Sequence, residues 1–221
     1  MRQLKFALIT EGISEHNIIK HILQRYCDKE PIINQLQPQI IDSKQRTIGG
    51  WCEVLKYCER EADLQEALRN NDYIVIQIDT DMCETSPFSV SKQENGRMLT
   101  EQELWNRVSE RLHSAIPDSI DKSRIIFAIS SDIIECWLLP IFCTSEVTKK
   151  KVLGCLSKLN AELKRNNLHP ITDKNSIQAQ RTYRSILKLI KKRNDIKKCA
   201  DYHYGFKEFL QQLSLLPDNR G

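Results

Sequence analysis

Three short apolar segments, each suited to a buried strand, alternate with helical patterns over roughly the first 130 residues. They cover residues 4–10, 73–78 and 124–129, and apolar side chains recur at helical spacing after each of them. Strands that alternate with helices are typical of parallel βαβ units, because parallel neighbours need a long crossover connection. The pattern therefore predicts an α/β fold, Rossmann-like, with a mostly parallel sheet flanked by helices.

The connecting segments carry weaker signals. We expect the first helix to begin with Ser14 as its N-cap and with Glu15 in its first turn, where the helix dipole favours negative charge. A weak second strand is expected at residues 36–41. Residues 83–99 contain Pro, Gly and many polar side chains, which predicts a surface loop that could lie over a site. Residues 130–142 are expected to form an amphipathic helix.

Charge is unevenly distributed along the 221 residues, whose net charge is +4. Residues 149–198 contain fifteen Lys and Arg against three Asp and Glu, so the rest of the chain is net acidic. We therefore expect an acidic domain over residues 1–145 and a basic, helical C-terminal extension over 146–221, packed on it. A basic portion can bind polyanions, although a merely solvated face would carry the same charges.

Cysteine usage and hydropathy indicate the compartment. The apolar run at residues 4–9 is too short for a signal-peptide core, and no segment approaches the roughly 20 apolar residues of a membrane span. We therefore expect a cytoplasmic protein. Its eight Cys form no CxxC pair and are expected to be free, mostly buried thiols, and its five His complete no Cys/His zinc site.

Acidic residues follow two of the expected strands. Glu11 comes directly after the first strand, and Asp79 and Asp81 follow the strand at 73–78. Ligands of a parallel α/β sheet collect beyond the carboxyl ends of its strands, so these carboxylates should meet at one edge. Such oxygens suit Mg²⁺ or Mn²⁺, and the set is a minimal site for phosphoryl transfer. No basic residue that would hold a scissile phosphate is evident beside these motifs.

The segments TEGISEHNIIKHIL and YIVIQIDTDMC resemble the Toprim domain shared by topoisomerases, bacterial primases and several nucleases, over about residues 4–142. With SSDIIECWLL, they look most like small stand-alone Toprim proteins of bacterial mobile elements and antiphage defence, which are relatives of the overcoming-lysogenization-defect nucleases. Those proteins are often encoded with an ABC-type ATPase partner. The resemblance implies that Glu11 acts as general acid/base or metal ligand, that Asp79 and Asp81 coordinate Mg²⁺ or Mn²⁺, and that Gly12 permits the sharp turn that aims Glu11.

Glu135 is a secondary candidate for the catalytic site. With Trp137 it matches the E-x-W element of the small relatives. A structural interpretation is also open, because Asp132 and Glu135 have the spacing of a capping box. Trp137 lies on an apolar pattern, which favours a place in the core over a role as a stacking platform.

A basic helix is expected near the C-terminus. Apolar residues at helical spacing would pack it on the domain, at Ile186, Leu189, Ile190 and Ile196. The rest of its surface is basic, and its candidate nucleic-acid contacts are Arg181, Arg184, Lys188, Lys191 and Lys192. Such charges give salt-sensitive affinity for DNA or RNA, although docking of an ATPase or simple solvation could use them equally.

Two functional hypotheses follow from these features. The first is a Mg²⁺-dependent nuclease that acts as an effector of an antiphage system or of a mobile element. The second is a non-catalytic Toprim-like adaptor that binds nucleic acid or a partner ATPase. A nucleotide-binding enzyme of the P-loop kind is disfavoured, because the Gly-rich phosphate loop is absent. The sequence leaves the choice of DNA or RNA and the oligomeric state open.

Overall fold

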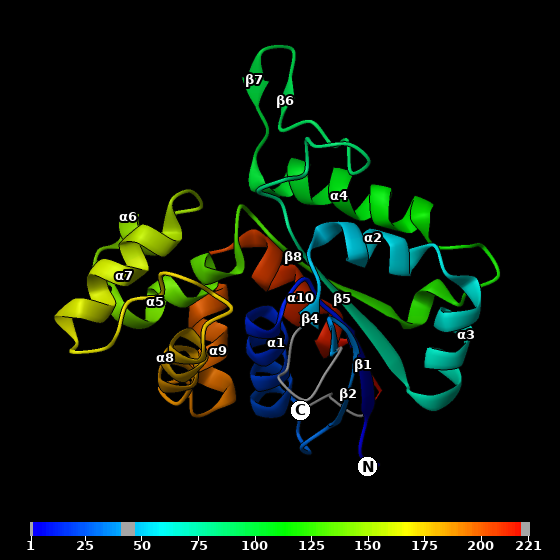
Figure 1. The fold of residues 1–221 in the computed structure, drawn as a ribbon, viewed down its shortest axis with the longest axis horizontal. Coiled ribbons are helices and arrows are strands. Elements are labelled where there is room, and N and C mark those ends of the chain that lie inside the picture. The colour runs from blue at the N-terminus through cyan, green and yellow to red at the C-terminus, as the bar shows by residue number, and fades with distance from the viewer. Residues whose placement is uncertain (1, 41–46, 218–221) are drawn as a thin grey trace.

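A four-stranded, all-parallel sheet with the order β2-β1-β5-β8 forms the centre of the protein. The computed structural model describes residues 2–40 and 47–217 (Figure 1). The sheet strands are β1 (Lys5–Ile9), β2 (Ile32–Gln37), β5 (Tyr73–Asp79) and β8 (Ile125–Ser130), and two small antiparallel pairs join β3 (Gln39–Ile40) to β4 (Thr47–Ile48) and β6 (Gln93–Glu94) to β7 (Arg97–Met98). The expected α/β fold with a parallel sheet is confirmed. The weak strand expected at residues 36–41 is in fact the end of β2 followed by β3, and Ile41 lies outside the described residues.

Helices cover both faces of the sheet. The helices are α1 (Ile13–Tyr26), α2 (Trp51–Cys58), α3 (Glu61–Asn70), α4 (Glu101–Ala115), α5 (Leu139–Phe142), α6 (Glu146–Lys149), α7 (Cys155–Arg165), α8 (Ile177–Leu187), α9 (Arg193–Ala200) and α10 (Tyr204–Ser214), with 3-10 turns η1 (Lys122–Arg124) and η2 (Ile134–Leu138). Helices α2–α4 lie on one side of the sheet, whereas α1 and α10 lie on the other (Figure 1). Within residues 2–40 and 47–217, no helix is long and apolar enough to cross a membrane.

The alternation of side chains along each strand produces two hydrophobic cores. In β1, Phe6 and Leu8 belong to the core beneath α1 and α10, whereas Ala7 and Ile9 belong to the core beneath α2–α4. Strands β5 and β8 alternate in the same way. This pattern is what a parallel sheet covered on both faces requires, because successive side chains point to opposite faces.

The C-terminal portion shares one of these cores with the sheet. Helix α10 packs against β8, and Gln212 bonds both the amide and the carbonyl of Phe127, at 2.9 and 3.0 Å. Gly205 lies so close to the Ile129 carbonyl that a Cβ atom there would clash with it. Helix α10 therefore packs on the sheet, while the division of the chain at residue 145 stays a prediction.

Two local expectations were wrong. The N-cap of α1 is Gly12, and the Ser14 hydroxyl instead bonds Glu15, because the helix begins two residues earlier than expected. The amphipathic helix expected at residues 130–142 is the turn η2 followed by the short α5. The capping box that would explain Glu135 structurally is absent there, because Asp132 has a left-handed φ of 63° and its side chain caps no helix.

The expectation of eight free thiols was wrong for one pair. Cys136 in η2 and Cys155 at the start of α7 form a disulfide, with 5.1 Å between their Cα atoms. They are 19 residues apart in sequence, so no short motif marks them, and only the packing of α7 on η2 brings them together. The other six cysteines are free, and four of them are buried.

Candidate active site

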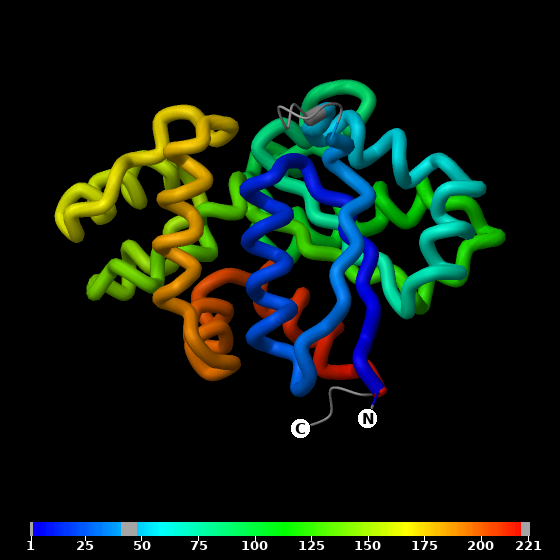
Figure 2. The backbone as a smooth tube through the Cα atoms, turned by 60° about the horizontal axis from the view of Figure 1, so that its bottom comes forward, coloured from blue at the N-terminus to red at the C-terminus, as the bar shows by residue number. Residues whose placement is uncertain are grey.

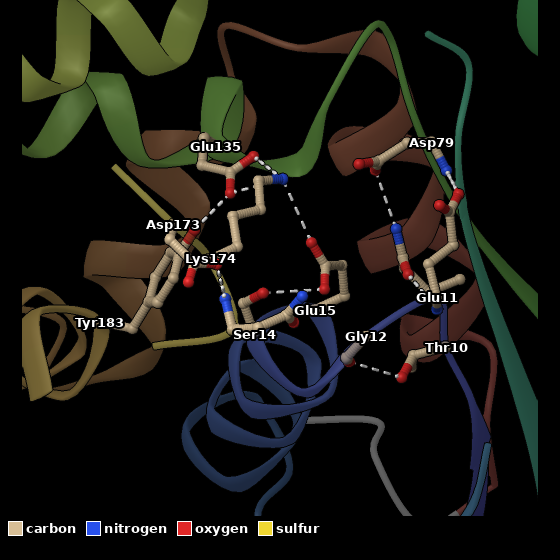
Figure 3. A network of polar contacts seen from close by, with 12 residues as sticks. Thr10, Glu11, Gly12, Ser14, Glu15, Asp79, Glu135, Asp173, Lys174 and Tyr183 are labelled. Atoms are coloured by element: carbon tan, nitrogen blue, oxygen red, sulfur yellow. Dashed lines mark hydrogen bonds and ion pairs between the residues drawn. The ribbon is translucent and has the colours of Figure 1, made fainter. Parts of the chain in front are cut away.

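The structure brings Glu11 and Asp79 into direct contact. Strands β1 and β5 are parallel neighbours, so their carboxyl ends lie at the same edge of the sheet. There the Asp79 N–H donates to Glu11 Oε1 at 2.6 Å. The buried Gln77 side chain completes the contact: its Nε2 donates to Asp79 Oδ1 at 2.9 Å, and its Oε1 accepts the Glu11 N–H at 3.2 Å. Figure 3 shows Glu11 and Asp79 side by side.

Asp81 lies on the exposed rim of this edge. Its Oδ1 accepts the Met82 N–H at 2.8 Å, and its own N–H donates to the Asp132 carbonyl at 3.0 Å. Thr80 N–H donates to the same carbonyl, and the Thr80 hydroxyl accepts the Asp132 N–H at 2.8 Å. The turns that follow β5 and β8 are therefore tied together, which fixes the backbone that carries Asp79 and Asp81.

The expectation that Gly12 is needed for a sharp turn was wrong. Gly12 has φ −150°, an extended conformation that any residue adopts, so no left-handed turn requires glycine there. A Cβ atom on Gly12 would lie 2.5 Å from Glu15 Oε2. Glycine at this position therefore leaves room for the Glu15 carboxylate.

A lysine from the C-terminal portion lies between two further carboxylates. Lys174 Nζ is 2.8 and 2.9 Å from the two oxygens of Glu135 and 3.3 Å from Glu15 Oε1, as Figure 3 shows. The Tyr183 hydroxyl of α8 donates to Glu135, whose side chain is fully buried. Three segments distant in sequence, α1, η2 and the stretch before α8, thus meet at one ion-paired cluster.

Sequence reasoning missed three members of this cluster, Lys174, Glu15 and Tyr183. Glu15 was assigned only to the helix dipole, although it lies inside the TEGISE segment. Lys174 lies in a polar stretch between α7 and α8, where nothing in the local pattern distinguishes it from other basic residues. Trp137 is buried in the core and stacks on Phe206 with 4.4 Å between ring centroids, which confirms its expected structural place.

Burial makes the acidic groups difficult to ionise. Burial raises the pKa of Glu11 to about 8, an effect that the Asp79 N–H opposes and that the charges of Glu15 and Asp81 increase. Burial, together with the Glu11 and Glu15 carboxylates, also raises the pKa of Asp79 well above its usual value. Burial therefore favours the protonated form of both carboxyl groups at this end of the site.

At the other end of the cluster, Lys174 keeps its positive charge. Burial on its own would lower the pKa of Lys174, but the carboxylates of Glu135 and Glu15 raise it above its usual value, so its ammonium group stays charged. Burial raises the pKa of Glu135, and Lys174 opposes this shift. The cluster thus holds a lasting positive charge beside carboxylates.

The donor set suits a hard divalent cation. Among the residues that the structure describes, no three His, Cys, Asp or Glu side chains converge as a preformed metal cage. Mg²⁺ is nevertheless often held by one or two carboxylates and several waters. Glu11 and Asp79 supply such oxygens at the carboxyl ends of β1 and β5, and Asp81 adds a third at the rim. The chemistry of these residues therefore fits Mg²⁺ or Mn²⁺.

The five basic candidates lie on the surface. Helix α8 runs beside α1 (Figure 2) and carries Arg181 and Arg184 on its outer side. Lys188 follows this helix, and Lys191 and Lys192 precede α9. All five side chains are exposed. Ile186, Ile190 and Ile196 are buried as expected, but Leu189 is 49% exposed, because α8 ends at Leu187 and its periodicity does not continue. Tyr183, on the opposite side of α8, connects this helix to Glu135.

Comparison of the chain with protein-family models, with curated proteins and with solved structures found no match. The resemblance of its motifs to Toprim domains therefore stays a prediction.

The raised pKa of Glu11 predicts that the free energy of unfolding falls between pH 7 and 8. In the unfolded chain this carboxyl has a pKa near 4.5, so up to about pH 8 the folded state holds a proton that the unfolded state has lost. Burial lowers the pKa values of His16 and His203 from 6.5 to about 4. These two groups make the free energy of unfolding rise with pH, but only below about pH 6.5, outside the range from pH 7 to 8. Urea titrations at several pH values measure this fall in the free energy of unfolding. Glu11→Gln should make the fall smaller by at most about 1.4 kcal/mol per pH unit, the limit for one group.

The exposed Glu66→Gln variant is the control and should leave this slope unchanged. A wild-type stability that rises from pH 7 to pH 8 would contradict the assignment.

Removal of Lys174 is expected to destabilise the fold through Glu135. Lys174→Met leaves a fully buried carboxylate without its cation, which should lower the free energy of unfolding by about 3 kcal/mol at pH 8. The loss should shrink at pH 5, where Glu135 can take up a proton, and adding Glu135→Gln should recover part of it. Chemical denaturation of these variants, with the exposed Lys188→Met as control, measures the effect; equal losses at both pH values would count against it.

Proposed function

We propose that the chain is a metal-dependent nuclease of Toprim type that cleaves phosphodiester bonds of DNA or RNA. The observation that carries this proposal is the contact of Glu11 with Asp79 at the carboxyl ends of adjacent parallel strands. Carboxyl groups with raised pKa values at such an edge are more typical of a functional site than of a structural one. The two quoted motifs supply the family assignment.

Asp79, Asp81 and Glu11 are the residues that would hold Mg²⁺ or Mn²⁺. A bound metal ion of this kind polarises a phosphate and neutralises the charge that develops during cleavage. Gln77 holds the Asp79 carboxylate in place, and the backbone bonds between residues 80 and 132 fix the position of Asp81.

Glu11 and Lys174 contribute through their own charges. A carboxyl group whose pKa is raised to about 8 can both accept and donate a proton near neutral pH, which suits a general acid/base. The ammonium group of Lys174 supplies the positive charge that the sequence motifs lack, and it opposes the rise in the pKa of Asp79. Glu135 orients Lys174 and is assigned a positioning role.

The basic surface of α8 and its flanking residues would bind the phosphates of a nucleic acid. The five exposed cations, Arg181, Arg184, Lys188, Lys191 and Lys192, lie on the portion of the chain that also supplies Lys174. The resemblance further supports a bacterial, cytoplasmic effector of antiphage defence or of a mobile element, acting with an ABC-type ATPase partner.

A non-catalytic adaptor is the second candidate. It is favoured by the ion pairs that already engage Glu15 and Glu135, and by the lack of a preformed metal cage among the described residues. Titration with Mn²⁺ separates the two functions, because only a catalytic site needs to bind the metal through Glu11, Asp79 and Asp81.

Cleavage of supercoiled plasmid, single-stranded DNA and tRNA with Mg²⁺ or Mn²⁺ tests the nuclease. Asp79→Asn/Asp81→Asn should abolish cutting, and Glu11→Gln should slow it by about 10²-fold or more, as expected for loss of an acid/base group. The exposed Asp118→Asn is the matched control. Unchanged cutting in the double variant would refute the site, and absence of both cutting and Mn²⁺ binding would favour the adaptor.

Salt dependence tests the basic surface. Arg181→Gln/Arg184→Gln/Lys188→Gln should weaken DNA binding and lower the slope of log K against log salt by about 0.9 for each phosphate that the protein no longer neutralises. Lys56→Gln/Arg69→Gln, on the exposed surface of α2 and α3, is the control. If the triple variant binds with the wild-type slope, nucleic acid does not use this surface.

A further inference from the structure

A cleft of about 90 Å³ is lined in part by Thr80, the residue between the proposed metal ligands Asp79 and Asp81. One side of the cleft is formed by the β6–β7 hairpin and the start of α4, and the other side by the segment before α7. The hairpin stands away from the body of the protein in Figure 1. Its lining includes Thr80, Lys92, Met98, Leu104, Asp132 and Leu153. None of the roles assigned above uses this cleft.

The cleft is linked to the candidate active site through the turns that follow β5 and β8. Thr80 lies between Asp79 and Asp81 in sequence, and its hydroxyl accepts the Asp132 N–H. Lys92 Nζ donates to the Asp81 carbonyl at 2.8 Å. A ligand group in the cleft would therefore contact the same pair of turns that carries Asp79 and Asp81.

The walls of the cleft are apolar and open to solvent. Met98 of the hairpin is 55% exposed and Leu153 of the opposite segment is 60% exposed, while Leu104 of α4 lies deeper. Large apolar side chains on both sides of a narrow cleft suit a flat ring, because both faces of the ring can be covered.

The floor offers a hydrogen-bond acceptor. Asp132 is half-buried and its carboxylate accepts the Gly154 N–H. A carboxylate has two oxygens and about four acceptor positions, so capacity is left for a ligand donor. The exocyclic amino groups of cytosine and adenine are donors of this kind, whereas uracil and hypoxanthine carry carbonyl oxygens in their place.

We propose that this cleft binds a nucleobase of the nucleic-acid substrate next to the scissile phosphate, with Asp132 accepting a hydrogen bond from an exocyclic amino group. The inference rests on the proposed nuclease function and adds to it a preference for an unpaired nucleotide, since a base inside a duplex cannot enter the cleft.

Binding of mononucleotides tests the cleft without any cleavage. Calorimetry in the presence of Mg²⁺ would compare CMP with UMP, AMP with IMP, and all four with ribose 5-phosphate, which lacks a base. CMP or AMP should bind about tenfold more tightly than ribose 5-phosphate, the order of one base contact, and more tightly than its carbonyl counterpart.

Variants at the cleft supply the controls. Leu153→Asp should reduce CMP and AMP binding to the level of ribose 5-phosphate, whereas Val147→Asp, at a residue 84% exposed and outside the cleft lining, should change nothing. Asp132→Asn keeps a residue that tolerates the left-handed backbone and should remove the preference for amino-bearing bases.

Equal affinity for nucleotides and ribose 5-phosphate, or absence of binding by all of them, would overturn the base site. Wild-type behaviour of Leu153→Asp would overturn it as well. These outcomes are separate from failure of the nuclease proposal: cutting that survives Asp79→Asn/Asp81→Asn would remove the catalytic assignment and leave a difference between CMP and ribose 5-phosphate intact.

Discussion

The ion pairs of Lys174 with Glu135 and Glu15 are the interaction on which the arrangement of the site depends. Two buried carboxylates with no cation would have to be protonated or exposed, since an isolated charge is costly in a protein interior. Lys174 meets this requirement from a segment far along the chain. It thereby ties the stretch before α8 to the first helix and to the turn that carries Glu135.

The C-terminal portion is therefore part of the site as well as part of the fold. It supplies Lys174 and Tyr183 to the acidic cluster and α10 to the face of β8. The same α8 that directs Tyr183 inward carries exposed cations on its outer side. The proposed contact with nucleic acid and the organisation of the buried cluster would thus involve the same helix.

The two ends of the cluster differ in electrostatic character. At one end, Glu135 and Lys174 satisfy each other, and the Tyr183 hydroxyl adds a further donor. At the other end, Glu11 and Asp79 lie together with pKa values that burial raises; the Asp79 N–H donates to Glu11, and the Gln77 amide donates to Asp79. Perturbed pKa values of this kind gather at functional sites, which is the basis of the proposed catalytic role.

Much of this molecule follows from short-range pattern. The apolar segments and the helical spacing between them determined the parallel α/β sheet, and the position of Glu11 and Asp79 at strand ends determined that they would meet, because parallel strands end at one edge. Local signals failed where neighbours in space decide the outcome, as for the cap of α1, the turn at residues 134–138 and the Cys136–Cys155 pair.

Only the tertiary structure decided which cation serves the acidic cluster and what surrounds it. The C-terminal portion contains many exposed lysines and arginines, and nothing in the local sequence distinguishes Lys174 from them. Its partners are chosen by the packing of α8 against α1 and of α7 against η2, both long-range contacts. Periodicity in a sequence reports which face of an element is buried, but the identity of the group buried opposite it is set by how the elements pack.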